Sequence, residues 1–233
     1  MNCVQRKIIH KHLGAIYFEG KEVEKDLSKG IEYFEAAAKL DNVYALYILG
    51  IIYYEGKFVE KDLTKSLGYL QKASYLKHSY SLYYLGLIYY HQGEISNQNY
   101  IKAREYFDLS VKYNNPSALF YLGFIYENGK GVEKDISKAI EYYTKSASIH
   151  YFTDRTVVLD KANYPSFAIE INMKNLNYNR SINDLGLIYI TEYQDVKLAE
   201  KYLKEAAFNE YPFGQNNLGL LFEFYLKMYV EFH

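Results

Sequence analysis

The sequence predicts an all-α solenoid, in which antiparallel helix pairs stack along the chain. Two recurring patterns predict this fold class. Six of the seven Leu-Gly dipeptides share one pattern: their glycines are spaced by 36, 36, 37, 63 and 33 residues, and an aromatic residue stands three positions after each glycine. A second pattern occurs five times: Asp or Asn, a small residue four positions later, and a tyrosine three positions after that. A period of about 20 to 50 residues is typical of repeat architectures.

The Leu-Gly pattern belongs to the first helix of each pair, which we call helix A. Spacings of three and four residues return side chains to one face of a helix. A glycine inside a helix costs about 1 kcal/mol relative to alanine, so we expect a neighbouring helix to pack closely on each bare backbone. We expect small residue pairs late in the second helix, such as Ala37 and Ala38, to supply the facing surface. The repeat glycines are Gly14, Gly50, Gly86, Gly123, Gly186 and Gly219, and their aromatic partners are Tyr17, Tyr53, Tyr89, Tyr126, Tyr189 and Phe222.

The second helix, helix B, begins after a residue that can accept a backbone hydrogen bond as N-cap. The predicted caps are Asp26, Asp62, Asn99, Asp135 and Asp195. Between the two helices, Gly20, Gly56 and Gly129 fit the left-handed position that ends helix A. The stretch "YENGKGVEKD", residues 126–135, is therefore a turn. It lacks the Ser or Thr that follows Gly-Lys in a phosphate-binding loop.

The repeats divide the chain into three segments of one continuous solenoid domain. Residues 4–149 hold four repeats, residues 150–179 form an irregular insertion or a decayed repeat, and residues 180–233 hold a fifth repeat and a partial sixth. Pro165 either opens a decayed helix A or belongs to the insertion. No helix B follows the sixth helix A, so we expect a truncated chain, self-association through the C-terminal end, or a terminal segment that folds back.

Written as one unit, L-G-x-x-Y-x-x-G-x-x-V-x-x-D-x-x-K-A-x-x-Y-x-x-A-A, the pattern resembles the Sel1-like repeat, a relative of the tetratricopeptide repeat. The resemblance covers residues 4–149 and 180 to about 226. It implies a right-handed superhelix of about five repeats plus a partial sixth, and work as an adaptor or scaffold. In related solenoids helix A lines the concave side, which implies a groove formed by the positions three before, one after and four after each glycine; the last of these is Glu127 in the fourth repeat. The aromatic-rich groove positions are Tyr47, Ile51, Tyr54, Tyr83, Leu87, Tyr90, Phe120 and Phe124.

Composition and motifs give no case for chemistry at a site. A net charge of -1 gives no reason to expect nucleic acid or an acidic membrane surface as a partner. The six histidines lack metal-ligand spacing, no serine stands in G-x-S-x-G, and Cys3 is the single cysteine. We therefore expect no catalytic, cofactor or metal site, and no enzyme. With no signal peptide or membrane span evident, the expected location is the cytoplasm.

These observations favour a non-catalytic scaffold that binds a peptide or protein segment in the aromatic groove. Two alternatives stay open. The groove rings could instead pack against neighbouring A helices, and the chain could be a regulatory or targeting repeat region of a longer enzyme, such as a kinase or an enzyme activator subunit. A hydrolase of the secreted cysteine-rich kind is disfavoured by the single cysteine.

Overall fold

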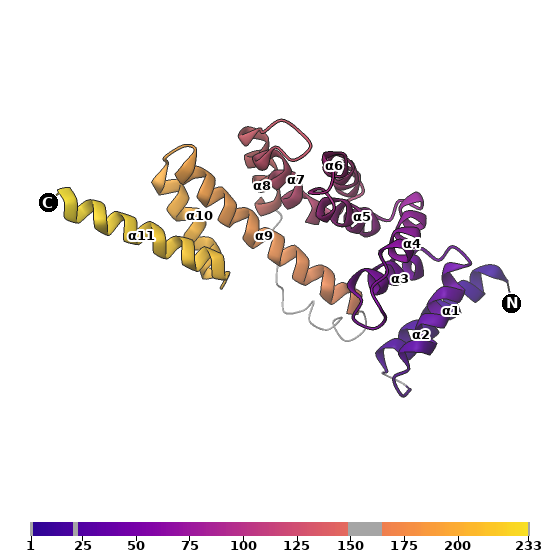
Figure 1. Cartoon of the computed structure of the whole chain (residues 1–233). Helices are drawn as coiled ribbons and strands as arrows, with labels where there is room; N and C mark the ends of the chain where they lie inside the picture. Colours follow the sequence, from indigo (N-terminus) through magenta and orange to yellow (C-terminus); the bar gives the residue numbers. More distant parts are fainter. Residues whose placement is uncertain (1, 21–22, 149–164, 233) are drawn as a thin grey trace. The chain divides into compact units, whose positions relative to one another are not determined.

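The structure is a computed structural model that describes residues 2–20, 23–148 and 165–232; for residues 165–175 and 224–232 it describes the backbone only. All regular structure in these residues is helical (Figure 1). The helices are α1 (Cys3–Glu19), α2 (Leu27–Ala38), α3 (Val43–Glu55), α4 (Leu63–Tyr75), α5 (Ser79–His91), α6 (Asn97–Lys112), the 3-10 turn η1 (Pro116–Ala118), α7 (Leu119–Asn128), α8 (Ile136–Ser148), α9 (Pro165–Thr191), α10 (Val196–Phe208) and α11 (Pro212–Phe232).

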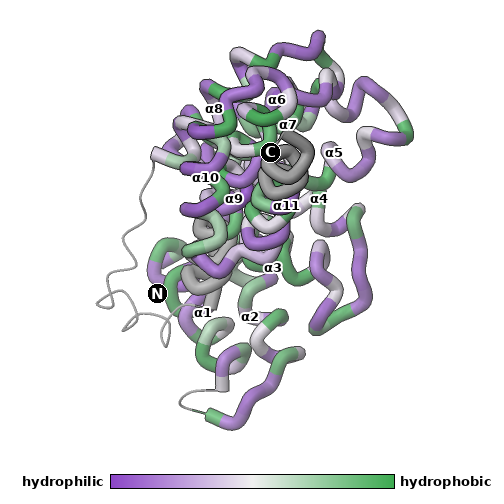
Figure 2. The backbone as a smooth tube through the Cα atoms, turned by 90° about the vertical axis from the view of Figure 1, so that its left-hand side faces the viewer, coloured by the Kyte–Doolittle hydropathy of each residue, from purple (hydrophilic) through white to green (hydrophobic). Residues whose placement is uncertain are grey.

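The chain forms two compact units, residues 1–115 and 116–233. In the first unit α1 packs on α2, α3 on α4 and α5 on α6, and in the second α7 packs on α8, α9 on α10 and α10 on α11. Figure 2 shows hydrophobic and hydrophilic residues along the helices. Helices α3 and α5 are buried around most of their circumference, and α5 has an unbroken run of buried residues at 81–88. The predicted all-α class of paired helices is confirmed.

A bulky side chain of helix B packs on the repeat glycine of helix A. A Cβ atom added at Gly86 would lie 2.5 Å from Phe107, and one added at Gly123 would lie 2.7 Å from Tyr143. We call the hollow over such a glycine a glycine socket, and the side chain in it the filler. The other filled sockets are Gly14 with Phe34, Gly50 with Leu70, and Gly186 with Leu203.

The expectation that the small pairs of helix B face these glycines was wrong. Two small residues opposite a bare backbone would leave a void, and protein interiors are close-packed. A small residue of helix B contacts the following helix A instead: a Cβ added at Gly214 in α11 would lie 2.5 Å from the Cβ of Ala206. The small pair thus belongs to the contact between successive repeats.

The turns between helices A and B follow the predicted chemistry. Gly20, Gly56 and Gly129 have φ values of 71°, 69° and 63° and end α1, α3 and α7 in the left-handed conformation. The side chains of four aspartates then accept backbone N–H groups at the start of helix B. They are Asp26 (from Lys29, 2.9 Å), Asp62 (from Lys65, 2.9 Å), Asp135 (from Lys138, 2.9 Å) and Asp195 (from Leu198, 3.0 Å).

Asn99 was wrongly predicted to be a cap. Helix α6 begins at Asn97, with Ser96 at its N-cap position. The Asn99 amide donates a hydrogen bond to the Gln92 carbonyl at 2.9 Å. Helix α5 ends at His91, and its C-cap residue Gln92 is not a left-handed glycine. The carbonyls at this end need other donors, and the side chain of Asn99 is one of them.

A stacked tyrosine pair joins helices A and B in each of five repeats. In the first repeat the rings of Tyr17 and Tyr33 lie 5.6 Å apart at 11°, and the Lys29 Nζ lies 4.1 Å from the Tyr17 centroid. Such a cation over a ring adds electrostatic attraction to the stack. The other pairs are Tyr53–Tyr69, Tyr89–Tyr106, Tyr126–Tyr142 and Tyr189–Tyr202, with interplanar angles of 7° to 10°.

Helix α9 extends the fifth repeat toward the N-terminus. It runs for 27 residues from Pro165 to Thr191, so Pro165 opens a helix, as the first of its two predicted roles requires. Residues 165–179, half of the predicted insertion, are thus part of this helix. Residues 149–164, which contain the rest of it, lie outside the described residues. The single continuous domain stays a prediction.

His78 is a half-buried N-cap of α5, and its titration should make the first unit sensitive to acid. Its Nδ1 accepts from the Ser81 N–H at 3.3 Å and lies 2.9 Å from the Ser81 hydroxyl, and the Tyr47 ring is 4.7 Å away. Burial lowers the pKa of His78 from 6.5 to about 4. The unfolded chain therefore takes up the proton first as the pH falls, and stability is lost between pH 6.5 and pH 4.

We expect His78→Asn to reduce this acid sensitivity. Asn42 caps α3 from the corresponding position, accepting from the Ala45 N–H at 3.0 Å, so asparagine keeps the cap without titrating. Between pH 7.5 and pH 5 the wild-type protein should lose about 2 kcal/mol that the variant keeps. Urea denaturation followed by circular dichroism at both pH values measures the difference. Equal pH dependence in the two proteins would contradict the assignment.

Candidate interaction surface

The eight predicted groove residues, which we call the helix-A set, differ in their exposure. Five are buried, with exposed fractions of 1% to 6%: Tyr47, Ile51, Tyr83, Leu87 and Phe120. Tyr54, Tyr90 and Phe124 are half-buried. The buried rings pack on their own unit; Tyr83, for example, lies 6.0 Å from the filler Phe107. A partner can therefore reach the half-buried members more easily than the buried ones.

Tyr54 and Tyr90 occupy the same position in successive repeats of the first unit. The Tyr54 ring packs edge-on against the buried Tyr84 at 5.6 Å and 77°, and the Lys61 Nζ lies 5.3 Å from its centroid. The Tyr90 ring packs in the same manner against the buried Tyr100 at 5.6 Å and 66°. Each is an aromatic ring held against a rigid support, with part of its surface open.

The second unit holds a polar cluster that the sequence patterns do not predict. The filler Tyr143 donates its hydroxyl proton to Glu127 at 2.7 Å, and Asn183 donates to Asp184 at 3.0 Å. Glu127 comes from α7, Tyr143 from α8, and Asn183, Asp184 and a neighbouring arginine, Arg180, from α9. Asn217 of α11 also donates to Asn183 at 2.9 Å. The cluster thus draws side chains from four helices of one unit.

The two carboxyl groups of this cluster hold their protons more tightly than usual. Burial, with a smaller contribution from the nearby Glu127, raises the pKa of Asp184 to about 7, against the opposing effects of Asn183, Arg180 and Tyr143. Burial also raises the pKa of Glu127, against the hydrogen bond from Tyr143 and the charge of Lys134. A carboxyl group with a pKa near 7 can exchange a proton at neutral pH, so the charge of the polar cluster depends on pH.

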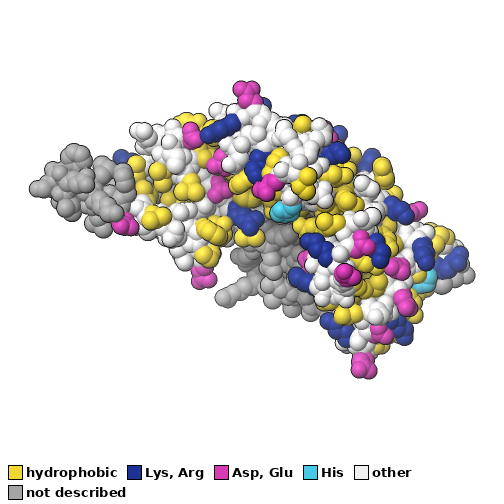
Figure 3. All heavy atoms as spheres, in the orientation of Figure 1, with side chains coloured by type: hydrophobic (Ala, Val, Ile, Leu, Met, Phe, Trp, Pro, Cys, Tyr) yellow, Lys and Arg dark blue, Asp and Glu magenta, His cyan; other side chains and the backbone are white. Residues whose placement is uncertain are grey.

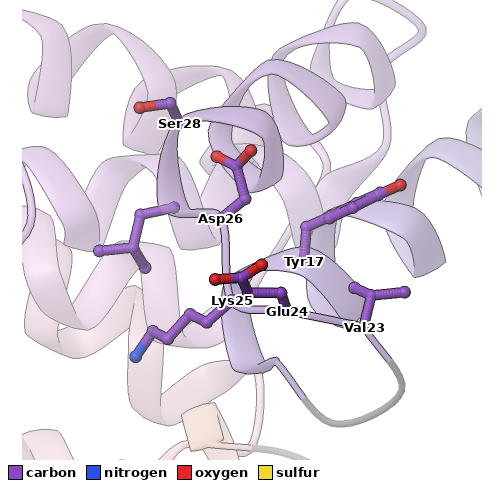
Figure 4. A pocket seen from close by; sticks show the side chains of 7 residues that line it. Tyr17, Val23, Glu24, Lys25, Asp26 and Ser28 are labelled. Atoms are coloured by element: carbon purple, nitrogen blue, oxygen red, sulfur yellow. The ribbon is translucent and has the colours of Figure 1, made fainter.

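A pocket of about 710 Å³ lies at the turn between α1 and α2 (Figure 4). Its lining residues are Tyr17 and the consecutive residues 23–28. Tyr17 is engaged in its stack with Tyr33, and Asp26 caps α2. The residues that line the pocket therefore serve the local structure of the turn.

In the described part of the chain, no group of three or more His, Cys, Asp and Glu side chains is placed to hold a metal ion. None of the described helices combines the length and the apolar character needed to cross a membrane. On the face drawn in Figure 3, positive and negative side chains are interspersed among hydrophobic ones.

The repeats match a known family. A family model described as the Sel1 repeat matches residues 12–42, 43–78, 79–112 and 116–149. The chain belongs to the Sel1 repeat family. Each matched segment contains the repeat glycine of one helix A and the helix B that supplies the filler. The resemblance read from the sequence is confirmed, and α9 to α11 add further helices after the four matched Sel1 repeats.

Two solved structures of Sel1 repeat proteins share the fold. One is a Sel1 repeat protein from Oxalobacter formigenes, with 20% identity, a TM-score of 0.68, and coverage of 94% of this chain and 78% of that one. The other is c5321, a protective antigen of uropathogenic Escherichia coli strains that displays an SLR fold. It shows 22% identity and a TM-score of 0.60, and the match covers 97% of this chain and 52% of that one.

A curated relative is the ERAD-associated E3 ubiquitin-protein ligase component HRD3B of Arabidopsis thaliana. It is 42% identical to this Sel1 repeat chain over 45 residues, which are 19% of this chain and 8% of the relative. The match therefore spans a small part of the relative's length.

Two signals in the sequence could have revealed the polar cluster. The residue after the helix B tyrosine is the filler in every filled Sel1 socket, and Tyr143 is the filler that carries a hydroxyl. Asp184 stands two positions before its repeat glycine, where Tyr84 and Tyr121 stand in the third and fourth repeats. An acid in place of an aromatic ring marks the fifth repeat as different.

Proposed function

We propose that this Sel1 repeat protein is a non-catalytic scaffold that binds a segment of a protein partner on the part of the helix-A set that lies in the first unit. The observation that supports this most directly is the pair of half-buried rings, Tyr54 and Tyr90, each packed edge-on against a buried tyrosine. Aromatic rings that are already immobilised lose little conformational entropy on binding and offer a large contact area. Tyrosine is also enriched at protein interfaces.

The relative supports an adaptor role for such a scaffold. HRD3B is named as a component of a ubiquitin ligase, and the match occupies 8% of its length, so the repeat occurs there within a longer protein. The same fact favours the second candidate, a regulatory or targeting repeat region of a longer enzyme. The cytoplasm remains the proposed location, because a chain with a single cysteine forms no internal disulfide and needs no oxidising compartment.

Alanine substitution of Tyr54 and Tyr90 together tests the proposal. Because both rings are half-buried, we expect a modest loss of stability and a loss of partner affinity of at least about tenfold, as for anchor residues at interfaces. Partners are first captured on the immobilised wild-type chain, and the affinity of a purified partner is then measured by calorimetry for wild type and variant.

Two variants serve as controls for this experiment. Tyr75→Ala removes a ring that is 84% exposed on α4, away from the helix-A set, and should change neither binding nor stability. Tyr83→Ala removes a ring that is 2% exposed and should lower stability by about 3 to 5 kcal/mol. Undiminished partner affinity in the Tyr54 and Tyr90 double variant would reject the helix-A set as the binding surface.

A further inference from the structure

Arg180 of α9 is held in place by an aromatic ring and a hydroxyl group. The Cζ atom of its guanidinium group lies 5.5 Å from the centroid of the Phe120 ring of α7. The guanidinium group also donates a hydrogen bond to the hydroxyl oxygen of Tyr211, the residue before α11. Phe120 is 6% exposed, whereas Arg180 and Tyr211 are half-buried. The guanidinium group is thus fixed on a buried ring, and part of it remains open to solvent.

The positive charge of Arg180 lacks a counter-charge near it. Among the described side chains, no carboxylate lies within ion-pair distance of Arg180. Asp184, four positions later in α9, is close enough for its charge to act on Arg180, but its pKa of about 7 leaves it mostly neutral below that pH. Arginine has five N–H donors, and the hydrogen bond to Tyr211 uses one of them. A fixed guanidinium group with unused donors and no counter-charge is suited to binding an anion.

The other carboxylates of this region are engaged with other partners. Glu127 accepts a hydrogen bond from Tyr143 at 2.7 Å and interacts with the charge of Lys134. On α10, Glu205 accepts the hydroxyl proton of Tyr178. In the polar cluster, the described neighbours of Arg180 therefore leave its charge unmatched as long as Asp184 is protonated.

We propose that Arg180 binds a side-chain carboxylate of an acidic segment of a partner protein. A guanidinium group and a carboxylate are both planar, so two parallel N–H···O bonds can form between them. The single positive charge of this site matches one carboxylate. A phosphate group carries a charge of about −1.5 to −2 at pH 7, which one arginine beside Glu127 does not neutralise. The site lies in the second unit, apart from the rings of Tyr54 and Tyr90, so the inference does not depend on the proposed function.

Asp184 makes this binding dependent on pH. Below pH 7 its neutral carboxyl group leaves the charge of Arg180 available to a ligand. Above pH 7 its carboxylate attracts the same guanidinium group from four positions along the helix and repels an incoming carboxylate. The groups that act on Asp184 from the packed helices are Glu127 of α7, Tyr143 of α8, and Asn183 and Arg180 of α9 itself. The acidic segment should therefore bind more tightly at pH 6 than at pH 8.

A blocked octapeptide of alternating glutamate and glycine is a suitable probe. Titrated into the isotope-labelled full chain at pH 6, it should shift the side-chain N–H signal of Arg180 and the backbone amide signals of α9 saturably in NMR spectra. The same peptide with glutamine in place of glutamate should bind at least about tenfold more weakly, because it carries no charge. Absence of a saturable shift, or tighter binding of a peptide with phosphoserine in place of glutamate, would overturn the proposal.

Variants of the full chain test whether Arg180 is the ligand of the carboxylate. Affinities are taken from the backbone amide signals of α9. Arg180→Gln should weaken binding at least about tenfold, and Arg180→Lys at least about threefold, because an ammonium group keeps the charge but cannot form two parallel bonds. Arg104→Gln is the matched control, since it removes an arginine whose Nη1 already lies 3.9 Å from Asp108, and should bind as wild type does. Undiminished binding in both Arg180 variants would overturn the proposal.

Asp184→Asn tests the pH dependence. The wild-type protein should bind the glutamate peptide at least about fivefold more tightly at pH 6 than at pH 8. The variant should bind it equally at both pH values, because asparagine stays neutral and the peptide stays ionised throughout. Equal wild-type affinity at both pH values would contradict the role of Asp184. A shift of the Arg180 signal with protein concentration alone would overturn the partner assignment, because a carboxylate of a second copy would then be the ligand.

Discussion

Gly86→Ala is expected to lower the free energy of unfolding of the first unit by about 1 to 2 kcal/mol. The new methyl group would lie 2.5 Å from Cε1 and 2.6 Å from Cδ1 of Phe107. Phe107 is fully buried and packs on Tyr83 at 6.0 Å, so its ring has little room to move. Overpacking of this kind costs about 1 to 3 kcal/mol and sometimes more, while the gain in helix propensity is about 1 kcal/mol.

The matched control for this substitution is Gly219→Ala. Its socket is unfilled by described residues, so only the helix propensity changes, and stability should rise by up to about 1 kcal/mol. Urea midpoints for both variants, measured by circular dichroism, give the comparison. A stabilising Gly86→Ala would show that the neighbouring helix can yield, and that close packing is not the reason for glycine at this position.

Asp184→Asn is expected to stabilise the protein more at pH 8 than at pH 4. The folded-state pKa of Asp184 is raised from 3.8 to about 7, so the folded state holds a proton that the unfolded chain releases. Between pH 4 and pH 7 the wild-type protein therefore loses stability as the pH rises, by up to about 4 kcal/mol. Asparagine mimics the protonated group and removes this loss. Melting temperatures of wild type and variant across this range measure the effect.

Asp135→Asn should give a pH dependence of the opposite sign. Hydrogen bonds from the Lys138 backbone and side chain lower the pKa of Asp135, which caps α8. Its contribution is present above its unfolded pKa and is lost as the pH falls through the lower folded value. The variant should therefore lose stability at neutral pH and not at low pH.

A gain from Asp184→Asn that does not change between pH 4 and pH 8 would contradict the burial of its carboxyl group.

The features predicted well from the sequence are those that depend on local chemistry. A glycine with positive φ, as at Gly56, and an aspartate that caps a helix, as at Asp62, act within a few residues of the chain. The filler of each socket was not predicted, because it depends on the distance between two helices. Asn99 was misassigned because its role is set by the end of α5, seven residues away.

The candidate site was predicted only in part. Repeat spacing placed the helix-A set on one side of each helix A, but it could not separate the buried Tyr83 from the half-buried Tyr90. That difference arises from neighbouring helices, which the pattern of a single repeat does not contain. The polar cluster brings Glu127 and Asp184 close together. The two residues do not occupy equivalent positions in their repeats, so the repeat spacing alone gave no reason to pair them.

The glycine socket has a consequence for how such a chain can diversify. The hollow accepts Phe34, Leu70 or Tyr143 over the same short distance, so the filler can be exchanged while the backbone stays in place. When the filler is Tyr143, its hydroxyl reaches Glu127 at 2.7 Å and brings a polar group into an otherwise apolar layer between two helices. Substitution of one filler can thus change the protonation of the carboxyl groups near it. Each repeat can therefore acquire its own polar groups independently of its neighbours.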